Sequence, residues 1–244
     1  MAHRTRKKLT KTELKKDPVN DALLKGMVYV QDHLKQILIA GAVLIVAVLV
    51  IQSLTGSSRR QSDEARAQYY LATQLYEMGM DNLVRYGETE TGIGQIQAAR
   101  QVAGNNYRNY PGRLPGKRSA ILAAKIGIMF RMESEVISDM QDFLATDPGG
   151  DLRNSASLHL AQALENRGGG EDIVNARYHY NDILSNTTEN SQLAWEAYSG
   201  LSRLDFKTND YQSSLENLQT ALEISRDTTD FVRYQLARLE MAMN

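Results

Sequence analysis

The sequence contains no cysteine among its 244 residues. This absence excludes disulfide frameworks, thiolate metal sites, thiol nucleophiles and lipid attachment through an acylated cysteine. It is compatible with an oxidising compartment but is not evidence for one. Beyond residue 56 the chain also lacks the long alternation of apolar and polar residues that indicates a strand, and it shows helical stretches broken by Gly, Pro and Asn. We therefore expect an all-α protein.

The net charge of −1 is the sum over two parts of the chain with charges of opposite sign. Residues 1–36 carry nine basic and four acidic side chains, whereas residues 37–244 carry 19 basic and 25 acidic ones. The near-neutral balance of the larger part argues against a dedicated nucleic-acid-binding protein. Residues 1–16 are polar and rich in Lys, and we expect a basic, flexible cytoplasmic tail. Contact with anionic lipid or ribosomal RNA is the alternative for this tail.

A long uncharged segment lies between Lys35 and Arg59. Within it, residues 37–54 are mostly Ile, Leu, Val and Ala, and these 18 residues reach about 27 Å as a helix. The hydrocarbon core of a bilayer is about 30 Å thick, so the segment predicts a single transmembrane helix. The alternatives are a buried core helix and a cleaved signal peptide, and the long segment that precedes the apolar run disfavours the signal peptide.

The segment before the predicted span, residues 17–36, has the features of an amphipathic helix. Asp17 and Pro18 are typical of a helix start. An apolar stripe with helical spacing follows, made of Val19, Leu23, Met27, Val30 and Leu34. We expect this helix to lead into the membrane. The Lys-rich tail favours a cytoplasmic N-terminus, which places the C-terminal domain on the other side of the membrane.

Small or medium-sized residues recur in the C-terminal part, residues 57–244. The series starts with Ala99, Val136, Ala176 and Ser214, at intervals of 37, 40 and 38 residues. Related residues follow four positions later at Ala103, Met140, Tyr180 and Leu218, and seven positions later at Asn106, Phe143, Ile183 and Ala221. Small side chains let two helices approach closely, and a tetratricopeptide repeat of 34 residues uses the same arrangement. The pattern predicts a tetratricopeptide-like helical-repeat solenoid.

The expected solenoid consists of about four helix pairs and a capping helix. The pairs are 62–78 with 94–108, 117–131 with 133–146, 152–166 with 171–185, and 190–207 with 210–225, followed by a helix at 228–243. Glycines at positions 79, 87, 92 and 94 predict an interruption within the first pair. A helical domain without true repeats is the alternative.

The sequence shows no arrangement typical of an active site. The four histidines lack the spacing of a metal-binding helix motif, and no cysteine can join them. The segment 112–117 resembles a phosphate-binding loop only superficially, because no strand precedes it, and we expect an inter-repeat loop there. No Gly-x-Ser-x-Gly motif occurs. We expect no catalytic residues, metal, cofactor or small-molecule substrate, and hence no enzyme.

The surface of the solenoid is the remaining candidate for function. In stacked helix pairs the first helices line a concave groove that suits peptides or partner helices. The repeat register places Arg118, Lys125 and Arg203 toward this groove, with Gln162 between them. Cations at these positions suit a carboxylate or an acidic peptide segment. The alternative is that they are solvated surface charges.

The order of these segments resembles the ancillary SecYEG translocon subunit family. Two sequences carry the resemblance: Val28-Tyr29-Val30-Gln31-Asp32-His33-Leu34-Lys35, directly before the predicted span, and Ala65-Arg66-Ala67-Gln68-Tyr69-Tyr70, after it. The resemblance implies an inner-membrane anchor, periplasmic repeats, no catalytic residues, and binding to the Sec translocon and to periplasmic chaperones or exported polypeptides. A structural accessory subunit of another membrane complex is the alternative function.

Overall fold

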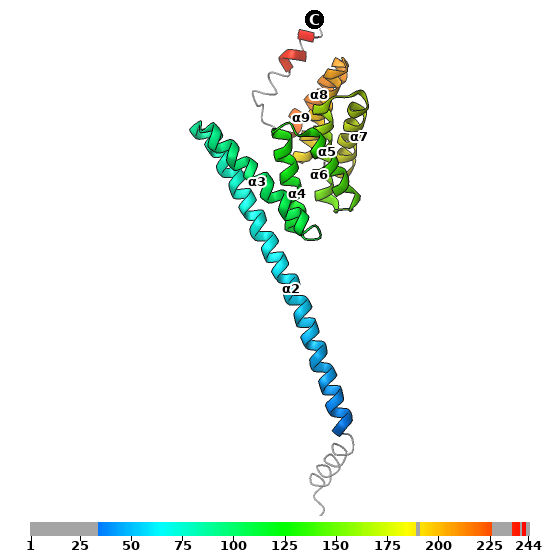
Figure 1. Ribbon diagram of the computed structural model, residues 1–244. Coiled ribbons are helices and arrows are strands. Elements are labelled where there is room, and N and C mark those ends of the chain that lie inside the picture. Colours follow the sequence, from blue (N-terminus) through cyan, green and yellow to red (C-terminus); the bar gives the residue numbers. More distant parts are fainter. Residues whose placement is uncertain (1–33, 189–190, 226–235, 240, 243–244) are drawn as a thin grey trace, which may run out of the picture. The chain divides into compact units, whose positions relative to one another are not determined.

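The computed structural model describes residues 34–188, 191–225, 236–239 and 241–242, and the side chains of residues 34–57 lie outside this description (Figure 1). The chain divides into two units, Met1–Arg59 and Arg60–Asn244. In the first unit the described element is the backbone of the first part of α2 (Leu34–Asp81), a helix that continues into the second unit. The predicted tail at 1–16 and most of the predicted amphipathic helix at 17–36 lie outside the described residues.

Among the described residues, no helix is both long enough and apolar enough to cross a bilayer. The predicted span at residues 37–54 falls within α2, where the backbone is helical and the side chains are not described.

Between Asn82 and Ser225 the second unit continues with eight further regular elements in its described part, and all of them are helices. They are η1 (Asn82–Tyr86), α3 (Thr89–Asn109), α4 (Leu114–Met129), α5 (Glu133–Ala145), α6 (Gly150–Arg167), α7 (Gly170–Asn186), α8 (Gln192–Lys207) and α9 (Tyr211–Ser225). The prediction of an all-α protein is therefore confirmed for the described residues. The predicted capping helix at 228–243 lies largely outside them, although residues 236–239 are helical and Leu239 packs near Leu218.

Consecutive helices pack against each other from α3 to α9, and alternate helices form two layers. In the first layer α4 contacts α6, and α6 contacts α8. Helices α5 and α7 pack on this layer from one side, each between two first-layer helices, and α9 packs on α8. Short connections force neighbouring helices to run antiparallel, which is the geometry of stacked helical hairpins.

The twelve residues of the sequence register are all buried. They lie on α3, α5, α7 and α9, and the most exposed of them, Leu218, has a relative accessibility of 3%. Large members such as Phe143 and Tyr180 each remove a whole side chain from water, and burial of such a side chain contributes about 2–3 kcal/mol. The register thus marks the faces by which these four helices are packed.

The glycine-rich segment does not form the long interruption that we predicted. Gly79 lies within α2, and Gly92 lies within α3, where the two helices cross. A Cβ on Gly79 would lie 2.8 Å from the Gly92 carbonyl oxygen, and a Cβ on Gly92 would lie 2.8 Å from the Gly79 carbonyl oxygen. These two glycines are therefore needed for close helix packing. The break is confined to η1 and the turn at Gly87, which has a φ of 68°.

A buried amide joins the first three helices of the second unit. Asn106 of α3 donates one hydrogen bond to the Ala65 carbonyl oxygen of α2, at 2.9 Å, and another to Ser119 Oγ of α4, at 2.8 Å. Asn106 and Ser119 are both fully buried. Leaving a buried polar group without a partner costs about 1–3 kcal/mol, so this residue selects one arrangement of α2, α3 and α4.

The crossing of α2 and α3 gives a paired test. We expect Gly92→Ala to destabilise the fold by about 2 kcal/mol, because its methyl group would collide with the α2 backbone. Gly94→Ala, two residues along the same helix, places its Cβ in open space and is expected to stabilise α3 by up to about 1 kcal/mol. Urea denaturation followed by circular dichroism measures both. Equal effects of the two substitutions would contradict the packing role of Gly92.

Candidate functional site

A cleft lies between helices α2, α4 and α6 in the second unit. It consists of two adjoining hollows with volumes of about 670 and about 590 Å³. The larger hollow is lined by Tyr69, Leu114, Arg118, Ile121, Leu122, Lys125, residues 148–152 and Ser155. The smaller is lined by Ser62, Arg66, Tyr69, Tyr70, Arg118 and residues 112–115. Because Tyr69, Leu114 and Arg118 line both hollows, we treat them as one feature, the α2–α4–α6 cleft.

Helix α4 supplies the central wall of this cleft. Arg118, Ile121, Leu122 and Lys125 follow at spacings of three, one and three residues, so they share one helix face. Their helix starts at Leu114, which means that the loop predicted at 112–117 is shorter than expected. Pro115 is tolerated in the first turn of a helix, where its missing N–H group has no bonding role.

The second wall begins at Gly149, which precedes α6. Gly149 has a φ of 90°, a conformation that a residue with a side chain rarely adopts, and it provides no side-chain cap for the helix. The first N–H groups of α6 therefore lack a side-chain acceptor from the N-cap residue. The start of a helix carries partial positive charge, and Asp151 in the first turn offsets part of it.

Four cations line the cleft: Arg66, Arg113, Arg118 and Lys125. The Lys125 ammonium lies 5.0 Å from the centre of the Tyr76 ring, close enough for a cation–π interaction. Arg113 donates to the Gln61 side-chain oxygen at 3.1 Å, so its charge is not neutralised by this contact. Arg118 is exposed and forms no ion pair with any residue that the structure describes.

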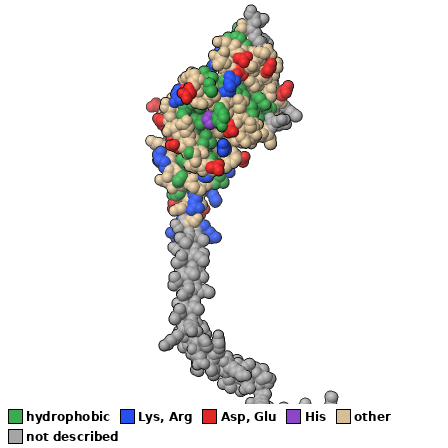
Figure 2. Space-filling view, turned by 90° about the vertical axis from the view of Figure 1, so that its right-hand side faces the viewer, with side chains coloured by type: hydrophobic (Ala, Val, Ile, Leu, Met, Phe, Trp, Pro, Cys, Tyr) green, Lys and Arg blue, Asp and Glu red, His purple; other side chains and the backbone are tan. Residues whose placement is uncertain are grey.

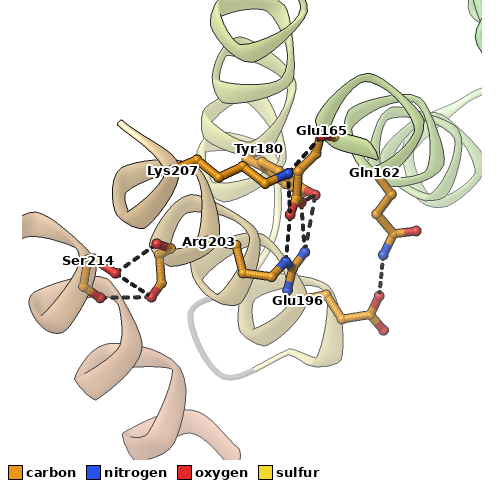
Figure 3. A network of polar contacts seen from close by, with 8 residues as sticks. Gln162, Glu165, Tyr180, Glu196, Arg203, Lys207 and Ser214 are labelled. Carbon is orange, nitrogen blue, oxygen red and sulfur yellow. Dashed lines mark hydrogen bonds and ion pairs between the residues drawn. The ribbon is translucent and has the colours of Figure 1, made fainter. Parts of the chain in front are cut away.

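Gln162 lies outside the cleft, in a polar strip on α6 and α8. Its amide oxygen lies 3.1 Å from His159 Nδ1. Its amide nitrogen lies 3.5 Å from a Glu196 carboxylate oxygen (Figure 3). Burial lowers the pKa of His159 and outweighs its hydrogen bond to Gln162 and the nearby charge of Glu196, both of which raise it. The structure thus places Gln162 in a satisfied side-chain network.

Arg203, like Gln162, does not line the α2–α4–α6 cleft, whereas Arg118 and Lys125 do. Its guanidinium Nε and Nη2 donate to the two carboxylate oxygens of Glu165 at 2.7 and 2.9 Å, and Lys207 Nζ donates to the Glu165 carbonyl oxygen at 2.8 Å (Figure 3). The side chain of Glu165 is 5% exposed and that of Arg203 is 28% exposed. Arg203 is therefore occupied by an ion pair and is not free to bind a ligand.

Tyr180 completes this cluster from α7. Its hydroxyl donates to a Glu165 carboxylate oxygen at 2.8 Å, and burial together with the Glu165 charge raises its pKa well above the ordinary value. Gly200 of α8 makes room for the ring, since a Cβ there would overlap it. For Arg203, burial is the largest single influence and lowers its pKa, but the hydrogen bonds and charges of Glu165 and Tyr180 together outweigh it and raise the pKa. The cluster ties α6, α7 and α8 together.

Sequence reasoning missed several lining residues of the cleft. Tyr69 was named only in the segment that carries the family resemblance, and Leu114 was expected to lie in a loop. Arg66 and Arg113 lie on different elements from the predicted groove residues, so no helical spacing connects them. The signals in the sequence were the two tyrosines of segment 65–70 and the basic residues near the expected loop at 112–117. Neither signal shows which residues face one another.

The described residues contain no group of three or more His, Asp or Glu side chains that could hold a metal ion. The carboxylates with lowered pKa values belong to local structure. Arg167 lowers the pKa of Asp172 through a direct ion pair, and a bond to Ser213 lowers that of Asp210. What the cleft offers is charge, aromatic surface and volume for a bound chain.

Comparisons with protein-family models, curated proteins and solved structures find no match for this chain.

The buried ion pair predicts a large effect of a single substitution. We expect Arg203→Leu to destabilise the protein by about 3 kcal/mol, because the buried Glu165 carboxylate then keeps only the neutral Tyr180 hydroxyl, at 2.8 Å, and the more distant Lys207 ammonium, at 3.8 Å. Arg85→Leu removes an exposed ion pair with Asp81 and is the matched control, with an expected loss below about 1 kcal/mol. Urea denaturation compares the two, and similar losses would show that burial adds nothing to the Arg203 pair.

The lowered pKa of His159 predicts a dependence of stability on pH. The unfolded chain takes up a proton at His159 near pH 6.5, whereas the folded protein does so only at lower pH. The unfolded state therefore binds more protons in this window, and stability falls as the pH decreases below about 6.5 until the folded pKa is reached. We expect His159→Gln to flatten this slope in urea denaturation between pH 7 and 5. A variant with an unchanged slope would rule out this origin.

Proposed function

We propose that the chain is a non-catalytic, membrane-anchored adaptor that binds polypeptides through its helical-repeat domain. The observation that carries the proposal is the α2–α4–α6 cleft, a pair of adjoining hollows with cations and tyrosines on their walls. Clefts lined by aromatic and aliphatic side chains with a few well-placed polar groups are typical binding sites. A peptide fits this combination, because its backbone and side chains use both kinds of contact.

The domain is proposed to be a tetratricopeptide-like solenoid. Burial of all twelve register residues supports this interpretation, as does the layer of first helices made by α4, α6 and α8. Ser202 and Ser214 add a further argument, because each hydroxyl donates to the other residue's carbonyl oxygen at 2.8 Å across the α8–α9 contact. Such close contact needs small side chains on both helices, which is the role of the small positions in a repeat.

The proposed anchor is the apolar segment at 37–54, with the basic tail in the cytoplasm and the repeats in the periplasm. This topology rests on the length of the uncharged segment and on the Lys-rich tail. A tether confines the repeat domain to a thin layer next to the inner membrane. Partners in the same layer then meet the domain at a high effective concentration, so a modest intrinsic affinity is sufficient for function.

The proposed partners are the Sec translocon together with periplasmic chaperones or exported polypeptides. This part of the proposal rests on the resemblance of residues 28–35 and 65–70 to the ancillary SecYEG translocon subunit family. No nucleic acid, small-molecule substrate or cofactor is included in the proposed function.

A structural accessory subunit of another membrane complex is the second candidate. A group of exposed apolar side chains on α2 and η1 favours it: Tyr70, Leu71, Met78, Val84 and Tyr86 are between 46% and 72% exposed. Leu71 and Met78 lie two turns apart on one face of α2, and large apolar side chains exposed along one face are typical of surfaces that bind a partner. A fixed partner covering this surface would also contact Tyr70, which lines the smaller hollow of the cleft.

Site-specific photo-crosslinking in intact cells tests the adaptor. We expect a photoreactive residue at Arg118 to capture polypeptides, because this position lies in both hollows of the cleft. The same residue at Val174, which is 66% exposed on α7, is the control and is expected to capture little. Mass spectrometry of the products identifies translocon subunits, chaperones or exported chains. Capture at Val174 but not at Arg118 would argue against binding in the cleft.

A further inference from the structure

The charges on the cleft walls are strongly unequal. Among the described lining residues, four are cationic and Asp151 is the one acidic side chain. This excess is local, because acidic and basic side chains are interspersed over most of the face of the domain drawn in Figure 2. A local excess of one sign attracts a ligand of the opposite sign and disfavours ligands of the same sign.

The cations are divided between the two hollows. Arg66 and Arg113 line the smaller hollow, Lys125 lines the larger one, and Arg118 lines both. The wall shared by the hollows also contains Tyr69 and Leu114, and Leu114 is 52% exposed. An apolar contact surface therefore lies between two groups of cations.

The chain itself does not provide a complementary occupant at its amino terminus. Residues 1–36 carry nine basic and four acidic side chains, so this segment has the same sign as the cleft. A lipid headgroup would match the charge but would leave the aliphatic lining formed by Ile121 and Leu122 uncovered. The chemistry therefore favours a polypeptide that carries both carboxylates and apolar side chains.

We propose that the α2–α4–α6 cleft binds an extended acidic segment of a partner polypeptide in which an apolar residue stands between acidic ones. The apolar residue packs on Tyr69 and Leu114, one carboxylate faces Arg113 in the smaller hollow, and the other faces Lys125 in the larger hollow. Arg118 contacts either carboxylate from the shared wall. This inference rests on the proposed function and adds the chemical class of its ligand.

Fluorescence anisotropy of the full chain in a non-ionic detergent tests the inference. The probe is a fluorescein-labelled peptide of alternating Glu and Leu residues. One competitor has Lys in place of Glu, and a second has the same composition with all Glu residues in one block and all Leu residues in another. We expect the alternating acidic peptide to bind at least tenfold more tightly than either competitor, and its affinity to fall with added salt because exposed charges are screened.

Charge-reversal variants identify the site of binding. We expect Arg113→Glu together with Arg118→Glu to weaken binding of the alternating acidic peptide about tenfold or more, since each reversal replaces attraction with repulsion. We expect Arg85→Glu to have no such effect. Arg85 precedes the start of α3, whereas cleft residues 112–115 follow the end of this helix, which is about 30 Å long. This length is well beyond the distance of about 10 Å over which salt screens exposed charges. Thermal melting by circular dichroism verifies that each variant is folded.

Three results would overturn the inference. They are equal binding of the acidic and basic peptides, equal losses in the Arg85 variant and the cleft variant, and displacement of the bound acidic peptide by an equal concentration of glycerol phosphate, a soluble lipid headgroup. If crosslinks from Arg118 still capture polypeptides in such a case, the adaptor function stands and only the ligand class is wrong. If they capture none, the proposed function fails as well.

Discussion

The side-chain amide of Asn106 is the contact on which the cleft depends. It bonds to the backbone of α2 at Ala65 and to the side chain of Ser119 on α4, so it sets the separation of two helices that form the cleft walls. Tyr69 lies one turn beyond Ala65, and Arg118 directly precedes Ser119. Because the amide is buried and has no access to water, a shift of either helix would leave a donor unpaired. The cleft is thus positioned by a polar contact in the interior.

The far end of the domain uses a charged contact for the same purpose. Glu165 accepts bonds from Arg203 and Tyr180, and Arg177 pairs with the buried Asp205 on the next helix. Buried ion pairs are not reliably stabilising when compared with apolar packing, but they are costly to break once one partner is in place. They therefore select one mutual arrangement of α6, α7 and α8. A rigid stack of helices is what an extended binding surface requires.

Much of the fold can be derived from the order of residues. The absence of strand alternation predicts an all-helical chain, and the spacing of small and apolar residues identifies the buried faces of α3, α5, α7 and α9. These deductions succeed because helical periodicity is a local property of a single helix. Arg118 and Lys125 were predicted from the repeat register to face one groove, and both line the larger hollow, since seven residues bring two side chains back to one helix face.

Other features were decided by contacts between distant segments. Gly92 was expected to help interrupt a helix, yet it lies inside α3. Glycine occurs both at helix interruptions and at close helix contacts, and only the contact with Gly79 shows which role Gly92 has. Arg203 and Arg118 are equivalent by register, but only Arg203 meets a buried carboxylate, from a residue 38 positions earlier. The sequence alone determined which faces are buried and where cations stand. The tertiary structure decided which of these cations form ion pairs, because neutralisation requires a carboxylate on the neighbouring helix.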